Sequence, residues 1–186
     1  MTTYKVGYLV GSLAKASINR KLARALVRLA PAALTLTEIS FADLPLYSYD
    51  FDADYPPVAR TFKGAIASVD AVLFVTPEYN RSIPGGLKNA IDWASRPYGD
   101  SAWFGKQAAI MGASSGRMGT ARAQYHLRQS FVFLQIDAIN NPEVMVANAD
   151  DHFDAQGNLT HETSRKLIRQ LLEALTERIH LVRSAR

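Results

Sequence analysis

Three short segments rich in glycine, serine and amide residues stand out in the chain, because groups of these types bind phosphates and flat polar rings. The first runs from Gly11 to Asn19, where Ser12, Ser17 and Asn19 can each donate to a phosphate oxygen. A helix is predicted to start at its end, and a helix N-terminus offers free N–H groups and the positive end of the dipole. The segment lacks both the nucleotide-triphosphate loop and the dinucleotide fingerprint, so a phosphate site and an ordinary capped helix both stay open.

The second segment, Pro77 to Gly86, places Tyr79 among acid and amide groups in a loop stiffened by prolines. An aromatic side chain can pack on a planar heterocycle, while backbone groups of residues 78–80 bond its edge. The third, 114–119, begins Ser114-Ser115-Gly116 and is another small polar turn ahead of a helix. Each loop alone also fits a plain strand-to-helix connection, and a rigid loop with a packed tyrosine is the simpler interpretation of the second.

The elements around these segments alternate between strand and helix along the whole chain. Short apolar runs predict buried strands, and apolar residues at helical spacing predict amphipathic helices between them. The predicted strands are 4–10, 34–39, 70–76, 106–111 and 139–146. The predicted helices are 18–30, 58–68, 84–95, 120–134 and 160–183, with a proline-containing loop over 41–57.

This alternation predicts an α/β protein with a flavodoxin-like, doubly wound, five-stranded parallel sheet in the order 2-1-3-4-5 and helices on both faces. A single domain over residues 1–186 is expected, since no linker or repeat interrupts the pattern. In such sheets ligands bind beyond the carboxyl ends of the strands, where all three segments would meet. Their convergence predicts a bound, phosphorylated, planar cofactor.

Composition narrows the classes of function. The 186 residues include no cysteine, which excludes disulfides, thiol nucleophiles and thiolate metal sites. The net charge of +4 comes from 21 basic and 17 acidic residues without a dense basic run, so nucleic acid is not an expected partner. No metal site is expected, because the calcium-loop-like Asp50, Asp52 and Asp54 are followed by Tyr55 where that loop needs glycine. No stretch predicts a membrane span or a signal peptide, and a cytoplasmic location is expected.

At these motifs the sequence resembles the NADPH-dependent FMN reductase family, in its quinone and chromate reductase branch. The resemblance covers essentially the whole chain in order, and its middle motif is highly specific. The matching segments are Gly11-Ser12 with residues 17–23, residues 76–80 and 82–93, and residues 124–129.

The resemblance implies an enzyme that passes a hydride from NADPH or NADH through FMN to quinones, chromate, azo compounds or free flavin. It assigns the first loop to the FMN phosphate, through Gly11, Ser12, Ser17, Ile18 and Asn19. It places Pro77, Glu78, Tyr79 and Asn80 at the isoalloxazine and ribityl edges, and Ser114, Ser115 and Gly116 against the ring from the other side. No side chain is expected to be an essential catalytic acid or base, because the cofactor supplies the chemistry.

The family also implies homodimers or homotetramers, and apolar faces expected on the helices around 85–93 and 125–133 agree with that. Two positions depart from the family pattern: Ala14 replaces a frequent arginine, and Gly119-Thr120 replaces a Gly-Gly pair. The first is expected to affect phosphate affinity, the second access to the ring.

Two other functions fit parts of the pattern. A flavodoxin-type carrier would bind FMN without turning over NAD(P)H, but such carriers are usually strongly acidic, whereas this chain is basic. A regulatory or nucleic-acid-binding α/β module would need a contiguous basic face, and the charges here are scattered along helices.

Overall fold

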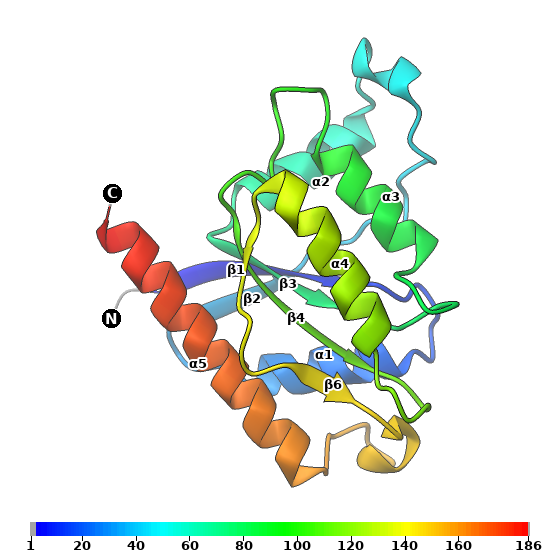
Figure 1. The fold of residues 1–186 in the computed structure, drawn as a ribbon, viewed down its shortest axis with the longest axis vertical. Coiled ribbons are helices and arrows are strands. Elements are labelled where there is room, and N and C mark those ends of the chain that lie inside the picture. The colour runs from blue at the N-terminus through cyan, green and yellow to red at the C-terminus, as the bar shows by residue number, and fades with distance from the viewer. Residues whose placement is uncertain (1–2, 186) are drawn as a thin grey trace.

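The computed structural model describes residues 3–185 of the chain. Its centre is a parallel sheet in the order β2-β1-β3-β4-β5, with a further short strand, β6, paired to β4 (Figure 1). The predicted flavodoxin-like order is therefore confirmed. The strands are β1 (Tyr4–Val10), β2 (Leu34–Glu38), β3 (Ala71–Val75), β4 (Gln107–Ala113), β5 (Asp137–Ala138) and β6 (Val144–Val146).

The central strands owe their place to their uniformly apolar sequences. All residues of β3 and β4 are buried, as expected where helices cover both faces of a parallel sheet. In the outer strand β2, Leu34 is buried and the other four of its five positions are at least partly exposed to solvent. Burial thus decreases from the middle of the sheet to its edge, which fixes β3 and β4 as the rigid base of the loops that follow them.

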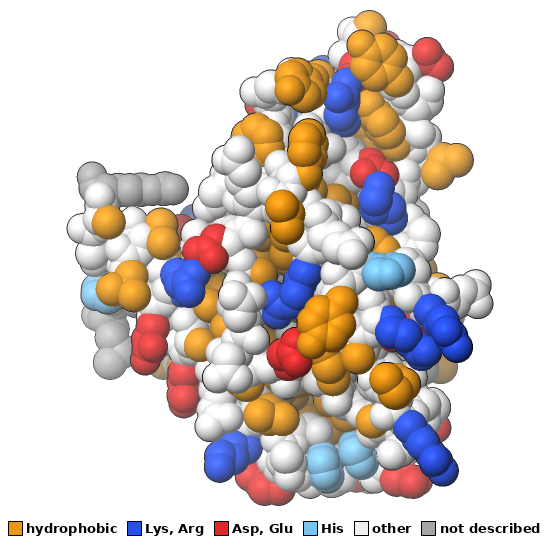
Figure 2. All heavy atoms as spheres, in the orientation of Figure 1, with side chains coloured by type: hydrophobic (Ala, Val, Ile, Leu, Met, Phe, Trp, Pro, Cys, Tyr) orange, Lys and Arg blue, Asp and Glu red, His pale blue; other side chains and the backbone are white. Residues whose placement is uncertain are grey.

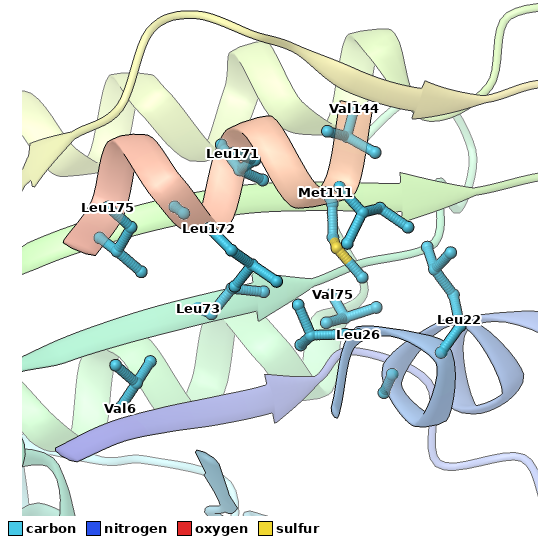
Figure 3. Close-up of a cluster of buried hydrophobic side chains, with 14 of the residues drawn as sticks. Val6, Leu22, Leu26, Leu73, Val75, Met111, Val144, Leu171, Leu172 and Leu175 are labelled. Carbon is cyan, nitrogen blue, oxygen red and sulfur yellow. The ribbon is translucent and has the colours of Figure 1, made fainter. Parts of the chain in front are cut away.

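Five α-helices cover the two faces of the sheet. On one face, Leu22 and Leu26 of α1 and the leucines of α5 pack on alternate residues of the strands (Figure 3). The other face is covered by α2, α3 and α4. None of the helices within residues 3–185 is both long and apolar enough to cross a membrane. The helices are α1 (Ile18–Leu29), α2 (Pro57–Ala67), α3 (Gly85–Ala94), α4 (Ala121–Leu134) and α5 (Glu162–Ser184).

The predicted fifth strand is not continuous. Residues 139–143 lie between β5 and β6 and include Pro142, which has no N–H to give to a sheet ladder. Ile139 still donates to the carbonyl of Ala108 at 2.8 Å, after which the chain leaves the sheet and returns at β6. The expectation of one strand over 139–146 is therefore wrong, although both pieces run parallel to β4.

The long loop before α2 packs on Trp93. Tyr47, Phe51 and Tyr55 surround the indole, whose N–H donates to the carbonyl of Pro45 at 2.7 Å. Asp52 at the end of the short 3-10 helix η1 (Tyr49–Asp52) forms an ion pair with Arg96. That guanidinium holds the pKa of the Asp52 carboxyl below its ordinary value.

Candidate functional site

Three loops leave the sheet side by side because β1, β3 and β4 end in register. Val10 is paired with Val75, and Val75 with Met111. The ladder continues one step further, since Gly11 donates to the carbonyl of Val75 at 2.8 Å and Thr76 to that of Met111 at 2.9 Å. The chain then passes to α1 on one face of the sheet and to α3 on the other. Doubly wound sheets have their ligand crevice at this switch point between neighbouring strands.

The first loop, residues 11–17, presents an anion-binding arrangement. Ser12 is only 3% exposed, and Ser17 at the N-cap makes no side-chain capping bond, so its hydroxyl is free to face a ligand. Helix geometry leaves the first N–H groups of α1, those of Ile18 and Asn19, without intrahelical partners. These hydroxyl and amide donors at the positive end of a helix suit a phosphate dianion.

The side chain of Asn19 bonds to the backbone of another element. Its amide nitrogen donates to the carbonyl of Ala113 at 2.8 Å, and its oxygen accepts from the N–H of the same residue at 2.9 Å. The amide therefore joins α1 to the end of β4, a structural role that the sequence did not predict, and the residue is only 2% exposed. These bonds use one of the two amide N–H groups, and the expected donation to a phosphate stays a prediction.

Tyr79 connects the first loop to the second. Its phenol oxygen lies 3.2 Å from the hydroxyl of Ser12, at hydrogen-bond distance, while 47% of the residue stays exposed. The predicted contact of this side chain was with a planar ring. In the structure its hydroxyl instead lies beside Ser12 of the first loop.

The second loop is a tight hairpin. Tyr79 and Ser82 exchange two backbone hydrogen bonds of 2.9 Å, and the two residues between them, Asn80 and Arg81, have φ values of 49° and 64°. Positive φ at both central positions is the geometry of a type I′ turn, which glycine and asparagine adopt most readily. Pro77, just before the hairpin, is buried, so the turn projects from a fixed base into the exposed edge of the sheet.

Glu78 makes contacts that local sequence spacing does not reveal. Its carboxylate accepts from the N–H groups of Arg122 and Ala123 at 3.0 and 3.2 Å, and it forms an ion pair with the Arg122 guanidinium. The Arg122 side chain makes this contact while 40% of it stays exposed to solvent. The start of α4 is consequently occupied by the protein's own carboxylate, and α1 provides the helix N-terminus available to an anion.

The third loop is held by the segment that follows β6. Ser114 donates to the carbonyl of Val146 at 2.9 Å, and the Ser115 hydroxyl donates to Asp150 in the 3-10 helix η2 (Ala149–His152) at 2.9 Å. Ser115 and Gly116 are exposed at the open edge. The sequence-predicted loop residues thus do meet at one edge of the sheet, with their backbone fixed from below.

Small and hydroxyl residues beneath the third loop allow the strands and α4 to approach closely. A Cβ on Gly112 would lie 2.2 Å from both the Thr76 carbonyl and the Thr120 hydroxyl. Thr120 is fully buried and accepts a hydrogen bond from Gln124 at 2.9 Å. Thr120 therefore faces the interior of the protein, and the expected effect of this position on access to the ring stays a prediction.

Two exposed apolar side chains at this edge were not singled out from the sequence. Leu13 in the first loop and Met118 in the third are both about half exposed, which is uncommon for large apolar groups in otherwise polar turns. The signal in the sequence was a single apolar residue within each polar loop. They add apolar surface beside the polar donors, as a flat aromatic ligand requires.

The combined donor set fits the cofactor that the resemblance implies. Hydroxyl and N–H donors lie at the start of α1, and the hairpin and third loop are exposed. Leu13 and Met118 add apolar surface on the first and third loops. Within residues 3–185, no cluster of three or more histidine, aspartate or glutamate side chains is arranged to hold a metal ion. The chemistry that the site supports is the binding of a phosphorylated aromatic cofactor with an exposed ring.

Comparisons with known proteins agree with this arrangement. A model of the NADPH-dependent FMN reductase family matches residues 4–151. A 2-hydroxy-1,4-benzoquinone reductase of a Burkholderia species is 48% identical over 169 residues, covering 91% of this chain and 92% of that protein. A quinone reductase of Pseudomonas putida KT2440 is 48% identical over 176 residues, covering 94% and 92%.

A solved structure is similar throughout. FerB, a flavoenzyme NAD(P)H:(acceptor) oxidoreductase of Paracoccus denitrificans, superimposes with a TM-score of 0.89 at 39% sequence identity. The match covers 96% of this chain and 98% of that one. Sequence and fold therefore lead to the same group of proteins.

Proposed function

The chain belongs to the NADPH-dependent FMN reductase family, and on that premise we propose that its three-loop edge binds FMN and makes it an NAD(P)H-dependent quinone reductase. The observation that supports this most directly is the convergence of three loops from β1, β3 and β4 beside the free N-terminus of α1. FMN has a phosphate at one end and a planar ring at the other, which matches the order of donors along this edge.

Each predicted residue has a place in this proposal. Gly11, Ser12, Ser17 and the N–H groups of Ile18 and Asn19 hold the phosphate, assisted by the Tyr79 hydroxyl. Pro77, Glu78, Tyr79 and Asn80 provide backbone to the ring and ribityl chain. Ser114, Ser115 and Gly116 approach the ring from the third loop.

Bound FMN supplies the redox chemistry of this family, with reducing equivalents entering from NAD(P)H and leaving to a quinone. The overall reaction converts NAD(P)H, a proton and a quinone into NAD(P)⁺ and a hydroquinone. No protein nucleophile takes part, so the residues of the site bind and orient rather than react. The hairpin and third loop hold the ring edge with backbone groups, and the exposed side of the crevice admits hydride donor and acceptor in turn.

Surface charge fits small anionic ligands better than nucleic acid. Figure 2 shows lysine and arginine side chains dispersed among acidic and uncharged groups on the face it presents. Nucleic-acid binding relies on a continuous basic stripe or patch. We propose small-molecule acceptors as the partners of this protein and the cytoplasm as its location.

We also propose that the chain forms a homodimer, or pairs of dimers, through α4. Val132 and Phe133 on this helix are 82% and 74% exposed, and Phe133 lines one hollow of about 380 Å³ together with Tyr98 and Phe104. Apolar surface of this kind marks an interface. The apolar residues of α3 do not contribute as expected, because Leu87, Ala90, Ile91, Trp93 and Ala94 are buried within the monomer.

The experiment that tests the function is FMN titration of the purified full-length chain followed by turnover with NADPH or NADH and a quinone. The expected result is stoichiometric flavin binding and rapid NAD(P)H oxidation that depends on the quinone. A chain that takes up no added FMN would overturn the proposal. A chain that binds FMN but shows no NAD(P)H turnover would be a flavodoxin-type carrier instead.

A further inference from the structure

The Glu78 side chain is turned into the protein although its residue lies in a loop at the open edge of the sheet. Only 6% of the side chain is exposed. Burial of an unpaired carboxylate is strongly unfavourable, so the partners of this group define where the loop can lie. One oxygen accepts from the N–H groups of Arg122 and Ala123, and the other pairs with the Arg122 guanidinium.

A second contact fixes the other end of the same hairpin. The Ser82 hydroxyl lies 3.0 Å from Nδ1 of His126, one turn further along α4, and the two form a hydrogen bond. The hairpin of residues 79–82 therefore stands between two attachments to a single helix. Because α4 begins at Ala121, directly after the third loop, these attachments set the position of the second loop relative to the third.

We propose that Glu78 is a positioning residue for the redox reaction: its carboxylate holds the second loop on the start of α4 and so sets the gap that receives the FMN ring. This inference rests on the proposed function. It assigns the carboxylate a role distinct from the cofactor contact of the Glu78 backbone, since both oxygens are directed at α4. The residue acts on the ring through the hairpin it holds.

The same contacts have an electrostatic consequence. The start of α4 has the positive end of a helix dipole and the charge of Arg122, and the carboxylate of Glu78 offsets most of this positive charge. Replacing its carboxylate by a neutral amide leaves that positive charge uncompensated beside the ring. A more positive electrostatic environment stabilises the reduced form of a bound redox group. The midpoint potential of bound FMN should therefore become more positive.

The test compares Glu78→Gln and Glu78→Ala with Asp137→Asn in the full-length chain. Asp137 forms a carboxylate–arginine pair with Arg178 at 2.5 Å at the opposite end of the sheet, which makes it a matched control for loss of an ion pair. The measurements are the FMN dissociation constant by flavin fluorescence, the midpoint potential of the bound flavin, and the melting temperature without added flavin.

We expect Glu78→Ala to weaken FMN binding by about tenfold or more, because two helix N–H groups and a guanidinium lose their acceptor. Glu78→Gln keeps an acceptor for the N–H groups of the helix, so its loss of FMN affinity should be smaller than that of Glu78→Ala. The midpoint potential of FMN bound to Glu78→Gln should be more positive than in the wild-type protein. Asp137→Asn should keep the wild-type affinity and potential.

Unchanged affinity and potential in both Glu78 variants, with a wild-type protein that binds FMN, would overturn the inference. So would equal changes in Asp137→Asn, or a lower melting temperature in Glu78→Gln with neither flavin property altered. Failure of the wild-type protein to bind FMN would instead overturn the proposed function, so the two failures are distinguishable.

Discussion

The phenol oxygen of Tyr79 lies 3.2 Å from the hydroxyl oxygen of Ser12, although 67 residues separate them in the sequence. This contact joins the hairpin after β3 to the phosphate loop after β1. It places a side chain predicted for the ring beside the loop proposed to bind the phosphate. In the proposed function, the second loop therefore contacts both ends of the cofactor.

The Tyr79→Phe variant should bind FMN more weakly, by about tenfold, because it removes one hydroxyl donor near a charged phosphate. Turnover at saturating FMN should stay close to that of the wild-type protein, since the phenol takes no part in the reaction. Equilibrium titration and steady-state kinetics check the two parts. A thousandfold loss of turnover with FMN still saturating would contradict the binding role of Tyr79. Removal of the Asn80 side chain should likewise change FMN affinity without abolishing turnover, and a thousandfold loss there would contradict its binding role.

The Asn19→Ala variant should lose stability rather than phosphate contacts. Both hydrogen bonds to the backbone of buried Ala113 disappear, and about 2–3 kcal/mol of unfolding free energy should be lost with them. Urea denaturation measures this loss. Ser17→Ala is the reciprocal control: its hydroxyl makes no capping bond, so FMN affinity should fall while stability changes little. The reverse pattern would support the phosphate role of the Asn19 side chain.

Gly112→Ala should destabilise the protein by about 1–3 kcal/mol, because the added methyl group overlaps the Thr76 carbonyl and the Thr120 hydroxyl. Gly64→Ala, in α2, supplies the control. A Cβ there meets no atom of the described residues within 4 Å, and alanine favours a helix interior by about 0.5–1 kcal/mol over glycine. Opposite shifts in the denaturation midpoint are expected, and equal shifts would contradict the close packing beneath the third loop.

A pair of stacked histidines should make stability depend on pH. The His152 and His161 rings are 4.0 Å apart and nearly parallel. Burial and the neighbouring His161 lower the pKa of His152 below its ordinary value of 6.5, and nearby Asp151 opposes this shift. The folded state therefore binds fewer protons than the unfolded state just below pH 6.5.

The stabilising contribution of neutral His152 is complete above about pH 6.5 and is lost as the pH falls through its folded-state pKa. Unfolding free energies measured from about pH 7.5 to about pH 5 should decline in this range. His152→Gln cannot titrate, so its decline should be smaller. Parallel curves for the two proteins would contradict the prediction for His152.

Val132→Lys should dissociate the proposed dimer without unfolding the chain, because this side chain is 82% exposed in the monomer. A charge placed within an apolar interface loses solvation that it keeps on a free surface. Light scattering gives the mass of each species. Leu181→Lys, at another exposed apolar position on α5, is the control and should leave the mass unchanged. A wild-type monomer, or a Val132→Lys dimer as stable as the wild type, would count against an α4 interface.

The amino-acid sequence by itself determined the order of strands and helices, because hydrophobic period and turn residues act over a few neighbouring positions. The fully apolar run of β3 and the helical spacing of apolar residues along α1 could each be recognised from neighbouring residues. The strand β1 begins and ends where predicted. The three polar loops could also be placed at one edge, since parallel strands end together. The exception was residues 139–146, where Pro142 and the polar residues beside it interrupt the predicted strand.

Only the tertiary structure decided what the individual side chains of those loops contact. Asn19 bonds to Ala113, Tyr79 to Ser12, and Glu78 to the start of α4, across 94, 67 and 44 residues respectively. A buried polar group must find a partner, but which partner depends on how strands and helices from distant parts of the chain are brought together. Local pattern predicts where polar groups gather, whereas packing selects those that hold the protein together and those left for a ligand.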